Sequence, residues 1–304
     1  MDEKKEGLMN RIQELKKLRN AVILAHNYQI GEVQDVADYV GDSFELSRIA
    51  ANLEAEVIVF CGVTFMAETA AVLAPDKIVL LPETMAGCSM ADMATVDELL
   101  RKKAEHPDAA VVTYVNSSAA VKAHSDICVT SSNALNVVNS LETSEILFVP
   151  DKNLGSNIAA QTDKRIILWD GYCPAHDSIS IQDVAAAREA HPGAVIIVHP
   201  ECRPEVVQSA DYAFSTGAMI KFARETDYKK IVVGTEMGLL YRLEKENPHK
   251  EFYLLSEKLF CPTMKMTDLG KICKTMETMQ THVTVPEPIC GLARRPLERM
   301  LAVV

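Results

Sequence analysis

Residues 21–28, Ala21-Val-Ile-Leu-Ala-His26-Asn27-Tyr28, form an apolar run that ends on polar side chains. An unbroken apolar run of this length is typical of a strand covered on both faces of a parallel sheet. The same pattern returns twice, as Ala110-Val-Val-Thr-Tyr114-Val-Asn116-Ser117 and as Ala194-Val-Ile-Ile-Val-His199-Pro200-Glu201. The chain therefore contains three copies of one opening strand, each followed by groups that can hydrogen-bond or titrate.

Further similar segments follow each opening strand at nearly constant distance. They are residues 37–43, 125–131 and 210–216, then 56–62, 145–151 and 230–235, and finally 78–82, 166–170 and 252–256. A period of about 85 residues is too long for a solenoid repeat and fits a small α/β domain. We therefore predict three homologous three-layer α/β/α domains with parallel sheets, arranged about a pseudo-threefold axis with the active site at the centre.

The predicted division places an N-terminal helix at residues 1–20 and the three α/β repeats at 21–106, 107–191 and 192–268. Prolines within residues 105–108 and 190–193 separate the repeats from one another. A C-terminal extension, residues 269–304, has no counterpart in the repeats. We expect this extension to cover the site.

Composition narrows the classes of function. The 304 residues are 48% hydrophobic and carry a formal net charge of −11, without a basic stripe, which argues against a nucleic-acid partner. No apolar segment has the length of a membrane span, and the charged N-terminal helix does not resemble an export signal. We expect a cytoplasmic protein that acts on small molecules, whose eight cysteines are thiols or metal ligands.

Three of these cysteines occupy the same place in the three repeats. Cys88, Cys173 and Cys261 each close the last strand segment of a copy, so the predicted symmetry brings three thiolates around one centre. Cys61 and Cys128 lie in apolar strand segments and are expected in the core. The remaining three, Cys202, Cys273 and Cys290, are interpreted as incidental thiols.

Two metal sites are compatible with three such thiolates. Zinc would take a fourth ligand, which His176 of Cys173-Pro-Ala-His176 could supply. A [4Fe-4S] cluster, one per chain, would leave one iron open as a Lewis acid, and a proline after two of the cysteines is common among cluster ligands. The cluster is favoured because the surrounding residues suit an anionic substrate.

Three hydroxyl residues also recur at one position. Ser43, Ser131 and Thr216 each precede a helical pattern, which predicts a helix N-cap. Three helix N-termini that converge would offer free N–H groups to carboxylates or phosphate. The ends of the opening strands add candidate acid and base groups for proton transfer: His26, Tyr28, Tyr114, Asn116, His199 and Glu201.

Several motifs together resemble the quinolinate synthase family over essentially the whole chain. They are residues 25–29 (Ala-His-Asn-Tyr-Gln), 40–43 (Val-Gly-Asp-Ser), 59–63, 113–116, 150–155, 169–173, 199–201 and 215–217. The resemblance implies three stacked α/β domains that hold one [4Fe-4S] cluster. It also implies condensation of iminoaspartate with dihydroxyacetone phosphate to quinolinate, phosphate and water in de novo NAD biosynthesis, with a functional link to the aspartate-oxidising enzyme that makes iminoaspartate.

The resemblance also implies roles for individual residues. Cys88, Cys173 and Cys261 would hold the cluster. Carboxylates and phosphate would be bound by His26, Ser43, Tyr114, Asn116, Ser131, His199 and Thr216. Tyr28 and Glu201 would take part in isomerisation and ring closure, and His176 would lie beside the cluster.

Two other functions are compatible with the pattern. A diphthamide-type iron–sulfur enzyme would also have three α/β repeats with three cysteines, but would act through S-adenosylmethionine on a protein. A zinc-binding sensor would have Cys3His ligation. The recurring hydroxyls and the His-Asn-Tyr and His-Pro-Glu strand ends favour small acidic substrates.

Overall fold

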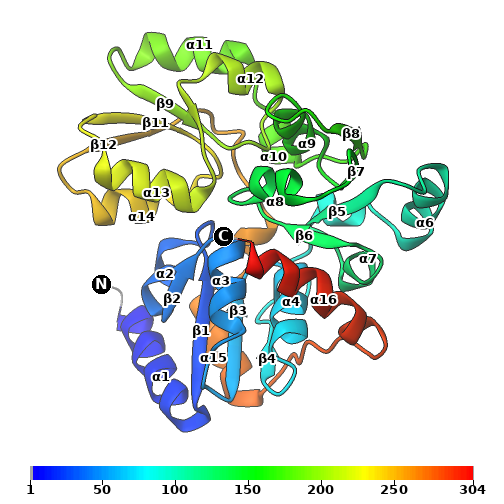
Figure 1. Cartoon of the computed structure of the whole chain (residues 1–304). Helices are drawn as coiled ribbons and strands as arrows, with labels where there is room; N and C mark the ends of the chain where they lie inside the picture. The colour runs from blue at the N-terminus through cyan, green and yellow to red at the C-terminus, as the bar shows by residue number, and fades with distance from the viewer. Residues whose placement is uncertain (1–2, 304) are drawn as a thin grey trace.

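The computed structural model describes residues 3–303 and contains three four-stranded parallel sheets (Figure 1). Each sheet has the same order, with the second strand of the domain at one edge, then the first, the third and the fourth. The strands are β1 Ala21–His26, β2 Tyr39–Gly41, β3 Val57–Cys61 and β4 Ile78–Leu80; β5 Ala110–Tyr114, β6 Ile127–Val129, β7 Glu145–Val149 and β8 Arg165–Leu168; β9 Val195–Val198, β10 Tyr212–Ala213, β11 Lys230–Gly234 and β12 Glu251–Leu254. The predicted α/β class with three parallel-sheet domains is confirmed.

Helices connect these strands and cover both faces of the sheets. They are α1 Glu3–Arg19, α2 Gly31–Val36, α3 Ser43–Ala50, α4 Thr64–Leu73 and α5 Ser89–Asp92; α6 Val96–Glu105, α7 Ala119–Ala123, α8 Ala134–Ser140, α9 Lys152–Ala159 and α10 Pro174–Asp177; α11 Ile181–Ala190, α12 Pro204–Ser209, α13 Thr216–Glu225 and α14 Gly238–Glu246; then η1 Thr263–Lys265, α15 Leu269–Thr278 and α16 Ile289–Ala302.

A helix precedes the opening strand of every domain, and it packs in the core of the domain that follows it. Leu99 of α6 lies in a cluster with Val111 and Leu147 of the second sheet. Val184 of α11 lies in a cluster with Ile196 of the third sheet. The divisions drawn at residues 106 and 191 therefore separate two helices from the cores that they help to form, and α1 is the first helix of the first domain.

The opening strands β1, β5 and β9 are central strands, with neighbours on both sides. Ala25 pairs with Cys61, Thr113 with Val149, and Val198 with Gly234, so the three sheets end in the same register. Because parallel strands end at one edge of a sheet, the polar residues after each opening strand gather at that edge. Figure 1 shows the three domains arranged around a common centre.

The C-terminal extension packs on the first two domains. Helix α15 lies beside α1, and its Ile272 and Met276 share a cluster with Ile12 and Ile23 on one face of the first sheet. Helix α16 packs on α4, α7 and β6. Within residues 3–303, no residue after Met264 lines the central cavity described below, and the role of residues 269–304 as a cover of the site stays a prediction.

Among the residues that the structure describes, no helix combines the length and the apolar character needed to cross a membrane.

Candidate active site

A cavity of about 370 Å³ lies where the three domains meet. All the residues predicted for the site line its wall. The first domain provides His26, Tyr28, Ser43 and Cys88; the second provides Tyr114, Asn116, Ser131, Cys173 and His176; the third provides His199, Glu201, Thr216 and Cys261. The repetition in the sequence thus brings these side chains together, while their individual roles stay predictions.

The three wall cysteines lie beyond the last strand of each domain rather than at the strand tip. Cys88 and Cys173 immediately precede the one-turn helices α5 and α10, and Cys261 precedes η1. All three are partly exposed, whereas the other five cysteines are buried. The expectation that these cysteines lie at the ends of strands was wrong, because in each domain the backbone continues past the edge of the sheet before it reaches the cavity.

The thiols of Cys88 and Cys173 are protonated when no metal is bound. Burial raises the pKa of Cys88 to about 12 and raises the pKa of Cys173 well above its ordinary value. A bound metal cation reverses this preference and holds a thiolate. Three soft sulfur donors, one from each domain and facing one cavity, therefore fit an iron–sulfur or zinc centre.

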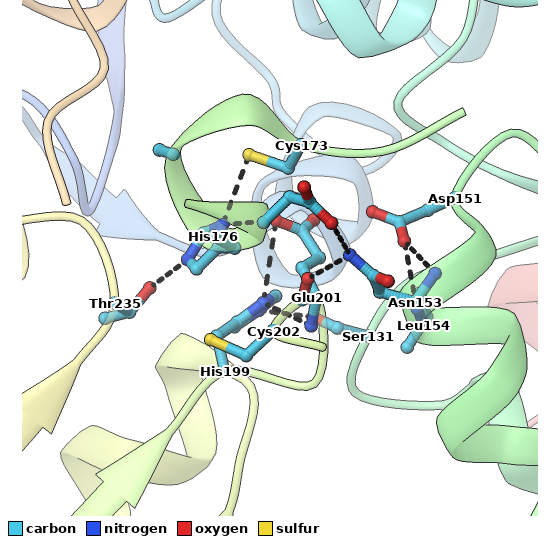
Figure 2. A network of polar contacts seen from close by, with 12 residues as sticks. Ser131, Asp151, Asn153, Leu154, Cys173, His176, His199, Glu201, Cys202 and Thr235 are labelled. Atoms are coloured by element: carbon cyan, nitrogen blue, oxygen red, sulfur yellow. Dashed lines mark hydrogen bonds and ion pairs between the residues drawn. The ribbon is translucent and has the colours of Figure 1, made fainter. Parts of the chain in front are cut away.

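His176 is fully engaged in hydrogen bonds (Figure 2). Its Nδ1 lies 2.7 Å from Glu201 Oε2 and 3.2 Å from Cys173 Sγ, and its Nε2 lies 2.9 Å from Thr235 Oγ1. Cys173, His176 and Glu201 place one potential ligand atom each within 4.8 Å of one another, so this group could hold a metal ion. As a fourth zinc ligand, however, His176 would have to give up one of its present hydrogen bonds.

Glu201 is the buried carboxylate at the centre of the polar network. It accepts a hydrogen bond from the Tyr114 hydroxyl at 2.6 Å, in addition to its contact with His176. Its loop is held from the second domain, because Asn153 of α9 donates to the Glu201 carbonyl and Asn157 donates to the Pro200 carbonyl. The carboxylate therefore has a fixed position at the junction of the second and third domains.

The electrostatics of this network separate a charged base from neutral rings. Burial opposes ionisation of Glu201, but the adjacent His199 and His176 and the hydrogen bonds from His176 and Tyr114 outweigh it, so the pKa of Glu201 lies below its ordinary value. Burial lowers the pKa of His26 to about 3 and that of His199 to about 4. Burial also raises the pKa of Tyr28 and Tyr114. At neutral pH the ionised Glu201 thus lies near the neutral rings of His26 and His199 and the protonated phenols of Tyr28 and Tyr114.

His26 and His199 share one arrangement. Nδ1 of each ring accepts the backbone N–H two residues later, at 3.2 Å from Tyr28 N and 3.3 Å from Glu201 N. A neutral ring that accepts at Nδ1 carries its proton on Nε2. In His199 this Nε2 lies 3.2 Å from Ser131 Oγ. Both rings can thus serve as hydrogen-bond donors through Nε2.

The three recurring hydroxyls line the cavity but are not helix N-caps. Asp42 caps α3 by accepting from the Glu45 N–H at 2.9 Å, and Ser215 caps α13 by accepting from the Ala218 N–H at 3.3 Å. Ser43 and Thr216 are the first helical residues, and Ser131 lies in the turn before α8. For α3 and α13 the residue one position earlier takes the capping role, which leaves Ser43 and Thr216 at the cavity wall in the first turn of each helix.

Three functional neighbours were missed from the sequence. Thr235 bridges Tyr28 and His176, and Glu236 accepts the Cys261 N–H at 3.1 Å and pairs with Lys265 Nζ at 2.8 Å. Lys265 also donates to the Tyr28 carbonyl. Thr235 ends the repeated segment 230–235, but nothing in the pattern pointed to a role for any of the three.

The fold and the cavity together define a three-domain α/β protein with a cysteine-lined acid–base site. A sequence model of the family described as Quinolinate synthetase A protein matches residues 10–302. The quinolinate synthase of Dehalococcoides mccartyi strain CBDB1 is 55% identical over 300 residues, which cover 99% of each chain. Quinolinate synthase 1 of Methanosarcina acetivorans is 54% identical over 296 residues (97% of each chain), and the quinolinate synthase of Geobacter metallireducens is 54% identical over 298 residues (98% of each chain). The chain belongs to the quinolinate synthetase A family.

Proposed function

We propose that this protein is an enzyme of NAD biosynthesis, a transferase that condenses iminoaspartate with dihydroxyacetone phosphate to give quinolinate, phosphate and water. The observation that carries the proposal is the cavity itself, in which one cysteine from each domain and an acid–base network centred on Glu201 face the same space. The family and the names of its relatives support the same activity.

Anionic substrates would be bound mainly by neutral donors. Among the lining residues, all within the described part of the chain, there is no lysine or arginine. The hydroxyls of Ser43, Ser131 and Thr216, the Asn116 amide and the N-termini of α3 and α13 face the cavity instead. Such groups bind carboxylates and phosphate without a full counter-charge. The Asn116 Oδ1 has no hydrogen-bond partner among the described residues, which supports a role in contact with a ligand.

Proton transfers would be divided between two sides of the cavity. Glu201, held in the cavity wall by Tyr114 and His176, is placed to take a proton from the substrate as general base. Tyr28, which stays protonated, suits the role of acid on the other side. His26 and His199 would orient the carboxylates through their Nε2 protons. Enclosure by three domains would keep unstable intermediates from water.

A [4Fe-4S] cluster would be held by Cys88, Cys173 and Cys261, one cluster per chain. When bound, it would supply one open iron as a Lewis acid for substrate oxygen. Zinc with Cys3His ligation is less well supported, because both ring nitrogens of His176 already have partners. Thiolates that bind iron need a reducing environment, so we place the reaction in the cytoplasm. Iminoaspartate would come from an aspartate-oxidising enzyme.

The proposal is tested by anaerobic purification, reconstitution with iron and sulfide, and incubation with dihydroxyacetone phosphate and freshly generated iminoaspartate. Quinolinate measured by chromatography should form in step with phosphate release. An absorbance band near 400 nm should accompany activity. Protein that binds zinc alone and forms no quinolinate would contradict the proposal, and cleavage of S-adenosylmethionine would favour the diphthamide-type alternative.

A further inference from the structure

One buried hydroxyl joins the three domains behind the cavity wall. Thr235 follows β11 in the third domain, and its Oγ1 lies 2.6 Å from the Tyr28 hydroxyl of the first domain and 2.9 Å from Nε2 of His176 in the second. Figure 2 shows the contact with His176. Thr235 is 0% exposed and is not a lining residue, so a substrate in the cavity cannot touch it.

These contacts form one chain of hydrogen bonds across the three domains. His176 Nδ1 lies 2.7 Å from the Glu201 carboxylate. On the other side of the ring, Thr235 Oγ1 connects His176 Nε2 to the Tyr28 hydroxyl. The chain therefore runs from Tyr28 through Thr235 and His176 to Glu201.

We propose that Thr235 is a positioning residue for Tyr28: its hydrogen bond fixes the place of the phenol that faces the substrate. The inference rests on the proposed function, because Tyr28 matters only if it acts on a substrate in this cavity. Tyr28 has no other side-chain hydrogen bond from its hydroxyl among the described residues. Without Thr235 the phenol would keep its ring contacts, at 4.5 Å from the centre of His26, but lose the bond that aims its oxygen.

The test compares two variants of the cluster-loaded enzyme. Thr235→Val has nearly the same shape but lacks the hydroxyl, and we expect quinolinate kcat to fall about 10- to 100-fold, as misplaced catalytic groups typically do. The KM values should stay within about twofold, because a positioning residue that does not touch substrate leaves ground-state binding intact. Thr235→Ser, which keeps the hydroxyl, should restore most of the rate.

A matched control is Thr267→Val. Thr267 is also buried, but its hydroxyl has no hydrogen-bond partner among residues 3–303, and it does not line the cavity. Its loss should leave kcat unchanged. Iron content and the affinity for quinolinate, measured on each variant, do not depend on turnover. Both should match the wild type in every variant.

A double substitution identifies the partner through which Thr235 acts. If Thr235 works through Tyr28, adding Thr235→Val to Tyr28→Phe should cause no further loss of kcat. Additive losses, failure of Thr235→Ser to restore the rate, or near-normal turnover of Thr235→Val would overturn the inference. Should Thr235→Val not fold, Thr235→Ala against Thr235→Ser decides by the same criteria. A wild-type enzyme that makes no quinolinate would instead overturn the proposed function.

Discussion

Glu201 is the residue on which the proposed proton transfers depend. Glutamine at this position keeps the size of the side chain and can still accept from Tyr114, but it cannot take up a proton. We expect Glu201→Gln to form quinolinate roughly 10²–10⁴-fold more slowly, the usual cost of a lost acid–base group. Iron content and affinity for a dicarboxylate analogue should be unchanged. Near-normal turnover of the loaded variant would move the base role to His26 or Tyr28.

The buried neutral histidines predict how stability depends on pH. The pKa of His26 is about 3 in the folded protein, against about 6.5 in an unfolded chain. Between these values only the unfolded state binds the proton, so acid favours unfolding. The free energy of unfolding should fall as pH drops below about 6.5, and His26→Gln should flatten the slope by up to roughly 1.4 kcal/mol per pH unit. Urea unfolding of metal-free protein measures this.

The control for the pH experiment is the exposed His249. His249→Gln should leave the slope as in the wild type. Equal slopes in the wild type and in His26→Gln would contradict the buried neutral state of His26.

Repetition explains which site residues could be predicted and which could not. The residues of the cavity wall could be predicted because equivalent positions of the repeats carry a thiol, a hydroxyl or a titratable side chain in more than one copy. In the aligned registers, Thr235 corresponds to Gly62 and Pro150, so its slot shows no recurring chemistry. Thr235 also acts through other side chains rather than on the cavity, and contacts between domains leave no local pattern in the sequence.

At the level of helices, the N-caps were misplaced by one residue for a physical reason. Asp42-Ser43 and Ser215-Thr216 each offer two capping residue types in succession. Only the conformation of the chain decides which of the two turns back to the third amide of the helix. The sequence could predict where α3 and α13 begin, but not which side chain is left to face the cavity.

This distinction gives a matched pair of substitutions. Ser215→Ala removes the cap of α13 and should cost about 1 kcal/mol of unfolding free energy, while the affinity for quinolinate stays the same. Ser43→Ala removes a wall hydroxyl and should weaken that affinity with little change in stability. Denaturant unfolding and equilibrium binding measure the two effects. The reverse result, with binding lost in Ser215→Ala alone, would contradict the assignment.

On the scale of the whole molecule, the C-terminal helix joins the first two domains. Leu297 of α16 is 0% exposed and lies in the apolar cluster that both domains share. Leu297→Ala should cost about 2–5 kcal/mol of stability, without changing kcat of the protein that remains folded. Leu292→Ala is the control, because Leu292 is 53% exposed on the same helix and its loss should cost less than about 0.5 kcal/mol.

The position of α16 could not be predicted because the extension has no counterpart in the repeats. Its amphipathic pattern indicated that it packs on something, but three domains offered several surfaces. The sequence pattern also could not show which core each linking helix joins. Prolines mark where a helix ends and an opening strand begins, but only packing reveals that the helix and that strand share a core.

The central claim is that one cysteine from each domain holds a single metal cluster at the centre of the molecule. Iron and sulfide per chain, measured after anaerobic reconstitution, test it most directly. We predict about four irons in the wild type, and loss of the cluster in Cys88→Ala, Cys173→Ala and Cys261→Ala. Cys273→Ala and Cys290→Ala are the controls, because these two cysteines lie on α15 and α16. Both control variants should keep the cluster. Iron and sulfide retained at wild-type levels in Cys173→Ala would contradict the account.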